Sequence, residues 1–226
     1  LQKLPDSPHK GYYQENIVGN KIIRLGANGD PRVAIQHLQR RLEQGIDPNF
    51  PHLRAYYYGA LGSLYAPIAY NDSAVYYYEK YFSYGLEHGI RKEVLLNVAN
   101  ELIRITGALG QLDKCKYYTN FCESSLPDVS YLKNLTAGIE LNLALYYMNV
   151  GAFKEKSKNY LDSAKVLIDE HPAKGMIRAS LMLVYYRYAS EWSKLFGEYK
   201  LACEMIEKFA LLNDSILSVK DLKEYD

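Results

Sequence analysis

The sequence predicts an all-α fold, a right-handed superhelix of about five antiparallel helical hairpins. Two observations carry this prediction. Apolar residues recur at the spacing of helix faces, and no segment shows the sustained alternation that is typical of a strand. In addition, one short figure, a turn followed by a small residue, recurs along the 226 residues at regular intervals. Such internal repetition is typical of solenoids that are built from helix pairs.

The small residue of each figure marks the place where the two helices of a hairpin cross most closely. Antiparallel helices joined by a tight turn approach each other near that turn, so the second helix needs a small side chain there. The small residues recur at steps of 40, 41, 42 and 45 positions: Ala34, Ala74, Cys115, Ser157 and Ala202. Larger residues four or seven positions further on are expected to fill the same seam: Leu38, Tyr78, Tyr81, Cys122, Ile206 and Phe209.

Start and stop signals divide the chain into hairpins. Asp30 is expected to cap a helix that begins at Pro31, and Gly45 is expected to end it. We expect a single repeat domain over residues 1–226, with hairpins at about 11–46, 51–89, 91–126, 130–171 and 172–220. The sequence leaves open whether the first hairpin is a true repeat or a cap.

Two glycines, Gly59 and Gly62, lie inside an apolar helix that is expected to end or kink at Pro67. Glycine in a helix interior costs about 1 kcal/mol relative to alanine. Its use twice in one helix therefore predicts that a neighbouring element approaches the backbone closely.

Composition and charge point away from several classes of partner. The net charge is only +1, which gives no electrostatic footprint for nucleic acid, an anionic membrane or a strongly acidic substrate. No apolar run reaches the length of a membrane span, so none is expected within residues 1–226. The chain has 23 tyrosines against 6 phenylalanines, and such rings suit either the half-buried core of a thin fold or a ligand groove. The three cysteines are expected to be buried free thiols, because an odd count forms no disulfide framework.

The residues that usually carry catalysis do not form a recognisable motif. The five histidines are not spaced three or four apart on any one helix, so no local metal site is expected. Nucleophile elbows, phosphate-binding loops and dinucleotide fingerprints are missing from the sequence as well. We therefore expect no enzyme activity, no cofactor and no bound metal. A small α-helical hydrolase, the opposing interpretation, would need an apolar pocket with a buried carboxylate or histidine.

The stretch FGEYKLACEMIEKF resembles the tetratricopeptide repeat (TPR), which has a Gly-x-Tyr turn followed by a small residue. The residues on motif positions are Gly197, Tyr199, Ala202, Ile206 and Phe209. The resemblance implies a TPR-like α-solenoid that binds other proteins or peptides. The steps of 40 to 45 are longer than the family's period of about 34 residues, so the helices are expected to be longer. HEAT-like repeats, which share the longer period, remain a structural alternative.

The end of the chain has a narrower resemblance. Leu212, Asp214, Ser215 and Ile216 form a phrase similar to the one that closes the periplasmic TPR sensor regions of Bacteroidetes membrane-bound transcriptional regulators and histidine kinases. This resemblance implies a non-catalytic, extracytoplasmic sensor or interaction region, with a signal peptide before Leu1 and a membrane helix after Asp226. The alternative is a soluble cytoplasmic TPR adaptor that holds a peptide or a partner protein.

The first helix of each hairpin lines the concave face of such an array, and this predicts a ligand groove. The residues that the repeat register places on it are Tyr56, Gly59, Ser63, Asn97, Asn100, Arg104, Arg187, Glu191 and Lys194. Asn97, Asn100 and Arg104 share one helix face and suit a peptide backbone, a carboxylate or the hydroxyls of an oligosaccharide. The opposing interpretation is a solvated polar face, with Arg187 paired to Glu191.

Overall fold

The computed structural model of the chain describes residues 19–24, 26, 29–46, 51–69, 71–151, 153–170 and 175–224. These residues form α-helices, one short 3₁₀ helix and the turns between them, and none of them lies in a β-strand. The expected all-α class is therefore confirmed. In this part of the chain, no helix combines the length and the hydrophobicity that crossing a membrane requires. Most of the first helix of the expected hairpin at 11–46 lies outside the described residues.

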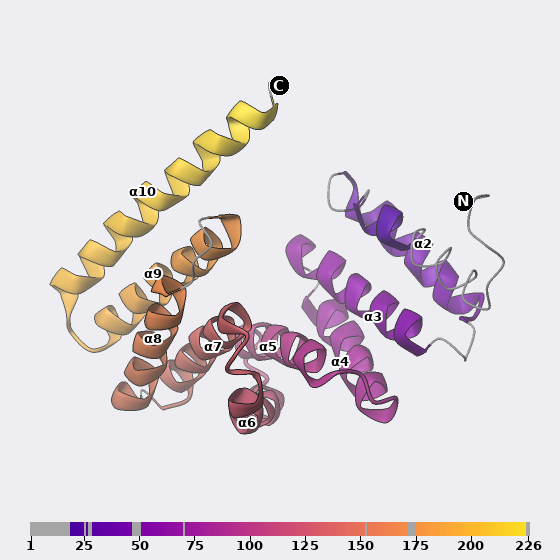
Figure 1. The fold of residues 1–226 in the computed structure, drawn as a ribbon, viewed down its shortest axis with the longest axis horizontal. Coiled ribbons are helices and arrows are strands. Elements are labelled where there is room, and N and C mark those ends of the chain that lie inside the picture. The colour runs from indigo at the N-terminus through magenta and orange to yellow at the C-terminus, as the bar shows by residue number, and fades with distance from the viewer. Residues whose placement is uncertain are drawn as a thin grey trace. The chain divides into compact units, whose positions relative to one another are not determined.

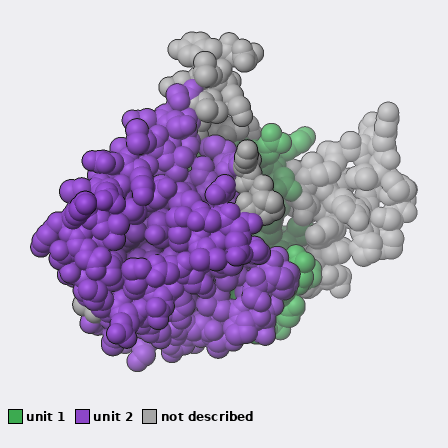
Figure 2. Space-filling model, turned by 60° about the vertical axis from the view of Figure 1, so that its left-hand side comes forward, with its two compact units in different colours: residues 1–109 green, residues 110–226 purple. Residues whose placement is uncertain are grey.

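The chain forms two compact units, Leu1–Leu109 (unit 1) and Gly110–Asp226 (unit 2), which have different colours in Figure 2. The boundary falls within the third expected hairpin at 91–126. Unit 1 therefore contains the first helix of that hairpin, and unit 2 contains the second.

In unit 1, consecutive helices pack on one another in chain order (Figure 1). The elements are α2 (Pro31–Glu43), α3 (Pro51–Tyr65), the 3₁₀ helix η1 (Ala66–Ile68), α4 (Asn71–Glu87) and α5 (Lys92–Ala108). Buried side chains of α2 and α3 form one hydrophobic core: Ala34, Ile35, Leu38, Tyr57, Ala60, Leu61 and Leu64.

Local chemistry explains where the helices of unit 1 begin and end. The Asp30 side chain accepts a hydrogen bond from the backbone amide of Arg32 at 2.9 Å, so the expected N-cap of α2 is confirmed. Pro31 occupies the first turn, where a missing N–H costs nothing. Pro67 lies in η1, directly after the end of α3, as the sequence predicts.

Unit 2 contains two complete hairpins and the helix that precedes them. Its helices are α6 (Leu112–Val129), α7 (Lys133–Gly151), α8 (Lys154–Asp169), α9 (Met176–Leu195) and α10 (Tyr199–Glu224). The first helix of each hairpin packs on its own second helix, and α9 also packs on both α7 and α8 (Figure 1). The buried core of α7, α8 and α9 contains Ala137, Leu141, Ala144, Met148, Leu161, Ala164, Ile168, Tyr188 and Trp192.

The repeat register is confirmed at all five small residues. Each of Ala34, Ala74, Cys115, Ser157 and Ala202 is at most 2% exposed. The serine has an added role, because its hydroxyl accepts a hydrogen bond from the indole N–H of Trp192 at 3.0 Å. This bond ties α9 to the first turn of α8.

Two sequence predictions about α10 are wrong. Ile206 was expected in the seam with α9, but it is exposed, and Met205 is the buried neighbour of Ala202 instead. Cys203 was expected to be buried, and it is exposed, whereas Cys115 and Cys122 are buried free thiols. Both errors have one cause, because α10 packs on α9 with one face and nothing described covers the face beside it.

The turn at Gly197 joins α9 to α10. Gly197 has a φ of +81°, a left-handed conformation that only glycine adopts freely. The amide of Glu198 donates to the carbonyl of Ser193 at 2.7 Å, which satisfies one of the last free carbonyls of α9. The sequence therefore identified this turn correctly.

Candidate functional site

The tyrosine groove is a hollow of about 440 Å³ in unit 1. Three consecutive helices, α3, α4 and α5, each present one face to it. The lining residues are Ile23, Tyr56, Gly59, Ala60, Ser63, Tyr78, Tyr81, Asn97, Val98 and Glu101. From α3, Tyr56 is followed by Gly59 and Ala60 three and four positions later and Ser63 comes three positions after Ala60, which is why a single helix face holds them.

Two glycines of α3 allow tyrosine rings of α4 to lie directly on its backbone. A Cβ atom on Gly59 would lie 2.6 Å from ring atoms of Tyr81, and a Cβ atom on Gly62 would lie 2.7 Å from ring atoms of Tyr78. Atoms do not approach that closely, so these positions require glycine for the rings to lie where they do. The close approach predicted for Gly59 and Gly62 is confirmed, and it forms a wall of the groove.

Hydroxyl and amide groups give the groove its polar surface. The Tyr56 hydroxyl donates to Oδ1 of Asn20 at 2.7 Å, and the Ser63 hydroxyl donates to the carbonyl of Ala60 at 2.9 Å. Both oxygens keep the capacity to accept a further hydrogen bond. Asn97 is exposed, and its amide can both donate and accept.

The charge in the groove is balanced within α5. One carboxylate oxygen of Glu101 accepts from Nε and Nη2 of Arg104, at 3.0 and 2.7 Å. Burial raises the pKa of the Tyr78 hydroxyl, and the nearby Glu101 carboxylate raises it further. Burial also raises the pKa of Tyr81. Both phenols therefore stay protonated at neutral pH and serve as hydrogen-bond donors.

A second hollow of about 420 Å³ adjoins the tyrosine groove, because Tyr56 and Tyr81 line both. We call it the cationic hollow, since it contains Arg91. Its other lining residues are His52, Leu53, Ile90 and Val94. Tyr56 and Tyr81 therefore lie between a half that is lined by hydroxyl and amide groups and Glu101 and a half that contains Arg91.

The structure brings together some of the predicted groove residues in unit 1. Tyr56, Gly59, Ser63 and Asn97 line the tyrosine groove. Asn100 and Arg104 do not line it. Asn100 is half-buried and already has an interaction partner, and Arg104 pairs with Glu101.

The sequence missed two important groove residues, Tyr81 and Glu101. Tyr81 was placed in the seam between helices. The sequence does contain a signal for Tyr81. It lies three positions after Tyr78, and the two glycines of α3 leave room for both rings. No sequence signal separates Glu101 from an ordinary surface carboxylate.

The predicted groove residues of the fifth hairpin lie on α9 in unit 2. Arg187, Glu191 and Lys194 are all exposed. The guanidinium of Arg187 lies 4.9 Å from the ring centroid of Tyr188 and donates to its hydroxyl at 3.2 Å. Among the ion pairs of the described residues, the expected pairing of Arg187 with Glu191 does not occur.

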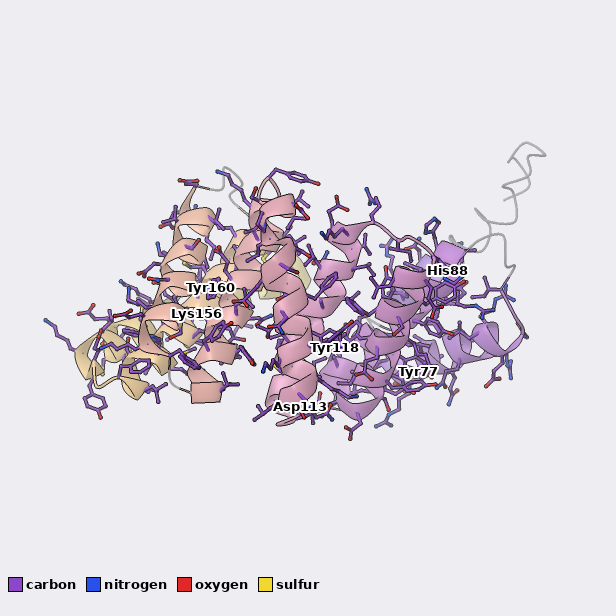
Figure 3. All side chains as sticks on the ribbon, turned by 90° about the horizontal axis from the view of Figure 1, so that it is seen from below. Tyr77, His88, Asp113, Tyr118, Lys156 and Tyr160 are labelled. Atoms are coloured by element: carbon purple, nitrogen blue, oxygen red, sulfur yellow. The ribbon has the colours of Figure 1, made fainter. Side chains whose placement is uncertain are left out.

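In unit 2 a polar cluster joins α6, α7 and α8. The Glu123 carboxylate accepts hydrogen bonds from the hydroxyls of Tyr147 at 2.8 Å and Tyr160 at 2.7 Å, and it pairs with the ammonium of Lys156 at 3.0 Å. Figure 3 labels Lys156 and Tyr160, both of which come from α8. These bonds hold the pKa of Glu123 below its usual range although burial opposes them. The cluster is satisfied internally.

Glu140 is a buried carboxylate near this cluster. One oxygen accepts from the Ser163 hydroxyl at 2.8 Å, and the other has no hydrogen-bond partner among the described residues. Burial raises its pKa, with the Ser163 bond acting in the opposite direction. Glu140 lines neither hollow of unit 1. In the described part of the chain, no three His, Cys, Asp or Glu side chains form a group that could hold a metal ion.

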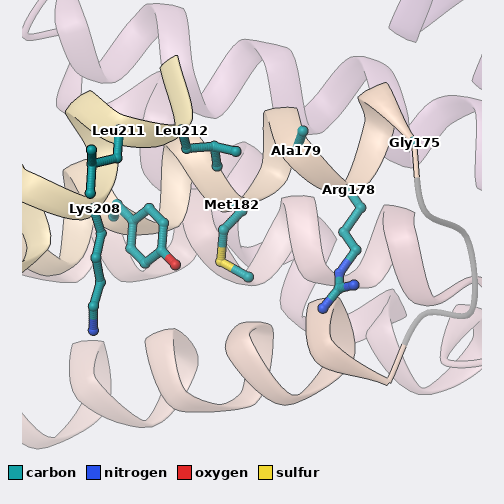
Figure 4. Close-up of a pocket in the computed structure, with 8 residues that line it drawn as sticks. Gly175, Arg178, Ala179, Met182, Lys208, Leu211 and Leu212 are labelled. Carbon is teal, nitrogen blue, oxygen red and sulfur yellow. The ribbon is translucent and has the colours of Figure 1, made fainter. Parts of the chain in front are cut away.

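A third hollow, of about 490 Å³, lies between α9 and α10 (Figure 4). Its surface is largely aliphatic, with Ala179, Met182, Leu211 and Leu212 among the lining residues. Lys208 and Arg178 lie at opposite ends of the hollow in Figure 4, with Met182 between them. Arg178 pairs with Asp169 at 3.6 Å. This hollow therefore lacks the hydroxyl and amide groups that line the tyrosine groove, apart from Tyr186.

Comparison with known proteins identifies the fold. No family model matches the sequence, and no curated protein matches it. The crystal structure of BtubC (BKLC) from P. vanneervenii is similar, with a TM-score of 0.68 and 17% identity over 91% of this chain and 80% of that chain. Two crystal structures of a candidate kinesin light chain from Podosopora anserina, with nearly identical TPR-like repeats, are also similar. Their TM-scores are 0.65 and 0.61 at 16% identity, over 91% and 93% of this chain and 97% and 98% of those chains. The chain therefore has a TPR-like, all-α solenoid fold.

Proposed function

We propose that this chain is a non-catalytic recognition scaffold that holds an extended peptide of a partner protein in unit 1. The observation that carries the proposal is the pair of hollows that share Tyr56 and Tyr81. Together they suit a ligand longer than a single small molecule. TPR-like folds are generally protein-interaction scaffolds, and this supports the choice of a peptide.

The two halves of the surface assign chemistry to the ligand. A carboxylate of the peptide lies against Arg91 in the cationic hollow, because a charge-assisted hydrogen bond is the strongest contact available there. An apolar or aromatic side chain packs between Tyr56 and Tyr81. The peptide backbone reaches Asn97, whose amide can pair with a backbone N–H and a carbonyl.

Fluorescence polarisation with labelled hexapeptides tests this assignment. Peptides with a free C-terminal carboxylate are expected to bind about tenfold more tightly than amidated ones, since a hydrogen bond to a charged group contributes about 1.5–3 kcal/mol. Arg91→Ala should abolish that preference, and Asn97→Ala should weaken both peptide forms. Arg32→Ala, at an exposed position of α2, is the matched control and should change neither. A preference that survives Arg91→Ala, or binding of oligosaccharides in place of peptides, contradicts the proposal.

We further propose that the chain is the extracytoplasmic sensor or interaction region of a membrane-bound bacterial regulator, located in the periplasm. The support is the closing phrase at Leu212, Asp214, Ser215 and Ile216 on α10, together with the TPR-like fold. The reading frame on both sides of residues 1–226 tests this. A signal peptide upstream and an apolar segment of about 20 residues downstream are expected. Flanking sequence without them favours a soluble cytoplasmic adaptor.

A further inference from the structure

Helix α10 carries an exposed apolar stripe beside the face that packs on α9. Its members are Tyr199, Cys203, Ile206, Ala210 and Leu217, all of which are exposed. Tyr199 is 69% exposed and Leu217 is 49% exposed. The members are spaced alternately four and three positions apart, with Asn213 in the remaining place. This is the heptad spacing with which one helix packs along another.

In the preceding hairpin, a neighbouring helix covers the corresponding surface. The repeat register equates Ser157 of α8 with Ala202 of α10, so Leu161 corresponds to Ile206. Leu161 is 2% exposed and belongs to the core that α8 forms with α9, whereas Ile206 is 43% exposed. The stripe of α10 is therefore the counterpart of a surface that a helix covers one repeat earlier.

Three more positions agree with this correspondence. Tyr199, Cys203 and Ala210 are the counterparts of three α8 lysines whose ammonium groups lie over aromatic rings of α9: Lys154 and Lys158 over Trp192, and Lys165 over Tyr185. On α8 these positions carry positive charge, and the neighbouring helix that contacts them bears aromatic rings. On α10 they are uncharged, so the helix that covers them is expected to be aliphatic or aromatic along the contact.

The charges beside the stripe identify the covering helix. Lys200, Glu207 and Asp214 follow the stripe at intervals of seven. If a second α10 lies antiparallel, with Ile206 facing Ala210 of the partner, then Lys200 faces the partner's Asp214. The same pair recurs on the other side of the two-fold axis.

We propose that the stripe is an interaction surface for a second copy of this chain, with α10 packed antiparallel to α10. The dimer is isologous and two-fold symmetric, and in each copy the partner's α10 covers the stripe as α9 covers the corresponding face of α8. Glu207 lies near the two-fold axis opposite its own copy, so like-charge repulsion limits the affinity. This proposal is independent of the peptide surface in unit 1.

Sedimentation velocity over a concentration series tests the surface. A reversible dimer is expected in the micromolar range. Ile206→Asp is expected to weaken it at least tenfold, and Leu211→Asp is the matched control, because Leu211 is 73% exposed on the opposite flank of the same helix. Far-UV circular dichroism and Trp192 fluorescence should show that both variants are folded. A chain that stays monomeric up to about 1 mM, or a dimer that both variants weaken equally, overturns the proposal.

The register has its own test. In the antiparallel arrangement Cys203 faces the partner's Asn213, so Asn213→Cys should form disulfide-linked dimers under mild oxidation and the unmodified chain should not. Asp214→Lys should weaken the dimer about tenfold and the double change Lys200→Asp with Asp214→Lys should restore it, while Glu207→Gln should strengthen it. Spontaneous cross-linking through Cys203 in the unmodified chain would mean parallel helices and would refute the arrangement.

Discussion

Two pairs of tyrosines, one pair in each unit, join helices in different ways. In unit 1, the rings of Tyr78 and Tyr81 lie on glycines of α3. In unit 2, the hydroxyls of Tyr147 and Tyr160 both donate to Glu123. The first pair joins α3 and α4 by ring packing, although elsewhere in unit 1 the hydroxyls of Tyr65 and Tyr77 accept hydrogen bonds from Gln39 of α2 at 3.2 and 3.0 Å. The second pair joins α6, α7 and α8 through one carboxylate, and the hollow between α9 and α10 in the same unit is largely aliphatic.

The largest expected effect comes from shortening a buried leucine, and it compares the hydrophobic cores of the two units. Leu141→Ala in unit 2 should lower the free energy of unfolding by about 2–5 kcal/mol, because the change removes buried methyl groups and leaves a cavity. Trp192 is the chain's single tryptophan and lies in the same core, so its fluorescence during denaturation measures unit 2. Leu61→Ala, equally buried in unit 1, should cost a similar amount by circular dichroism. A loss below about 1 kcal/mol for either variant would mean that its core is not tightly packed.

The next effect concerns the polar cluster itself. Glu123→Gln removes the negative charge that pairs with Lys156 and accepts hydrogen bonds from Tyr147 and Tyr160. The change should lower the free energy of unfolding of unit 2 by about 1–3 kcal/mol. Urea denaturation followed by Trp192 fluorescence is the measurement. Glu155→Gln, an exposed residue of α8, should change stability by less than about 0.5 kcal/mol. Equal effects of the two changes would show that the cluster contributes nothing specific.

The same cluster should depend on pH. The folded state lowers the pKa of Glu123, so its contribution is fully present above the unfolded value and is lost as pH falls through the folded value. The stability difference between the unmodified chain and Glu123→Gln should therefore shrink below about pH 4. A difference that stays constant from pH 7 to pH 3 would contradict the ion pair.

A smaller effect of opposite sign is expected at Glu140. Its folded pKa is raised, so the folded state binds more protons than the unfolded state between the two values, and stability falls as pH rises through that interval. Glu140→Gln should therefore stabilise unit 2 at pH 7 by about 0.5–2 kcal/mol, and the gain should disappear on acidification. Thermal denaturation at pH 7 and pH 4 measures both quantities. Destabilisation at pH 7 would indicate that the free oxygen has a partner.

The smallest effect on stability should be found in unit 1. Gly59→Ala must displace the Tyr81 ring, which is half-exposed and can move, while alanine favours the helix by about 1 kcal/mol. Stability should change by less than about 1 kcal/mol, yet peptide affinity should fall because a wall of the tyrosine groove has moved. Fluorescence polarisation measures the peptide affinity, and thermal denaturation of the same sample measures the stability. Unchanged affinity would show that Tyr81 does not contact the ligand.

The sequence predicts the array better than the site, for physical reasons. The crossing points at Ala34 and Ala202 depend on local turn chemistry and on one small side chain, both of which a pattern can detect. Tyr81 and Glu101 enter the groove through packing between helices, which depends on rotation of each helix about its axis. The Glu123 cluster joins residues 24 and 37 positions apart, and no local pattern records such a pairing.

Ile206 shows how a repeat pattern can mislead. Its motif position is buried in a hairpin that has a successor, as Leu161 demonstrates on α8. The pattern describes an interior repeat, whereas α10 has no described helix on that side. The register is therefore right, and the burial predicted for Ile206 requires a covering helix that is not among the described residues.

The difference among the three thiols gives the chain a chemical handle. Burial raises the pKa of the Cys122 thiol to about 12, with the Glu123 charge adding to the effect, so this sulfur stays protonated and unreactive at neutral pH. Cys115 is buried as well, and only Cys203 is exposed. A maleimide reagent should therefore modify one position without any engineering. Because Cys203 lies on the apolar stripe of α10, a bulky adduct there should weaken the dimer, and sedimentation velocity of the modified chain measures that loss.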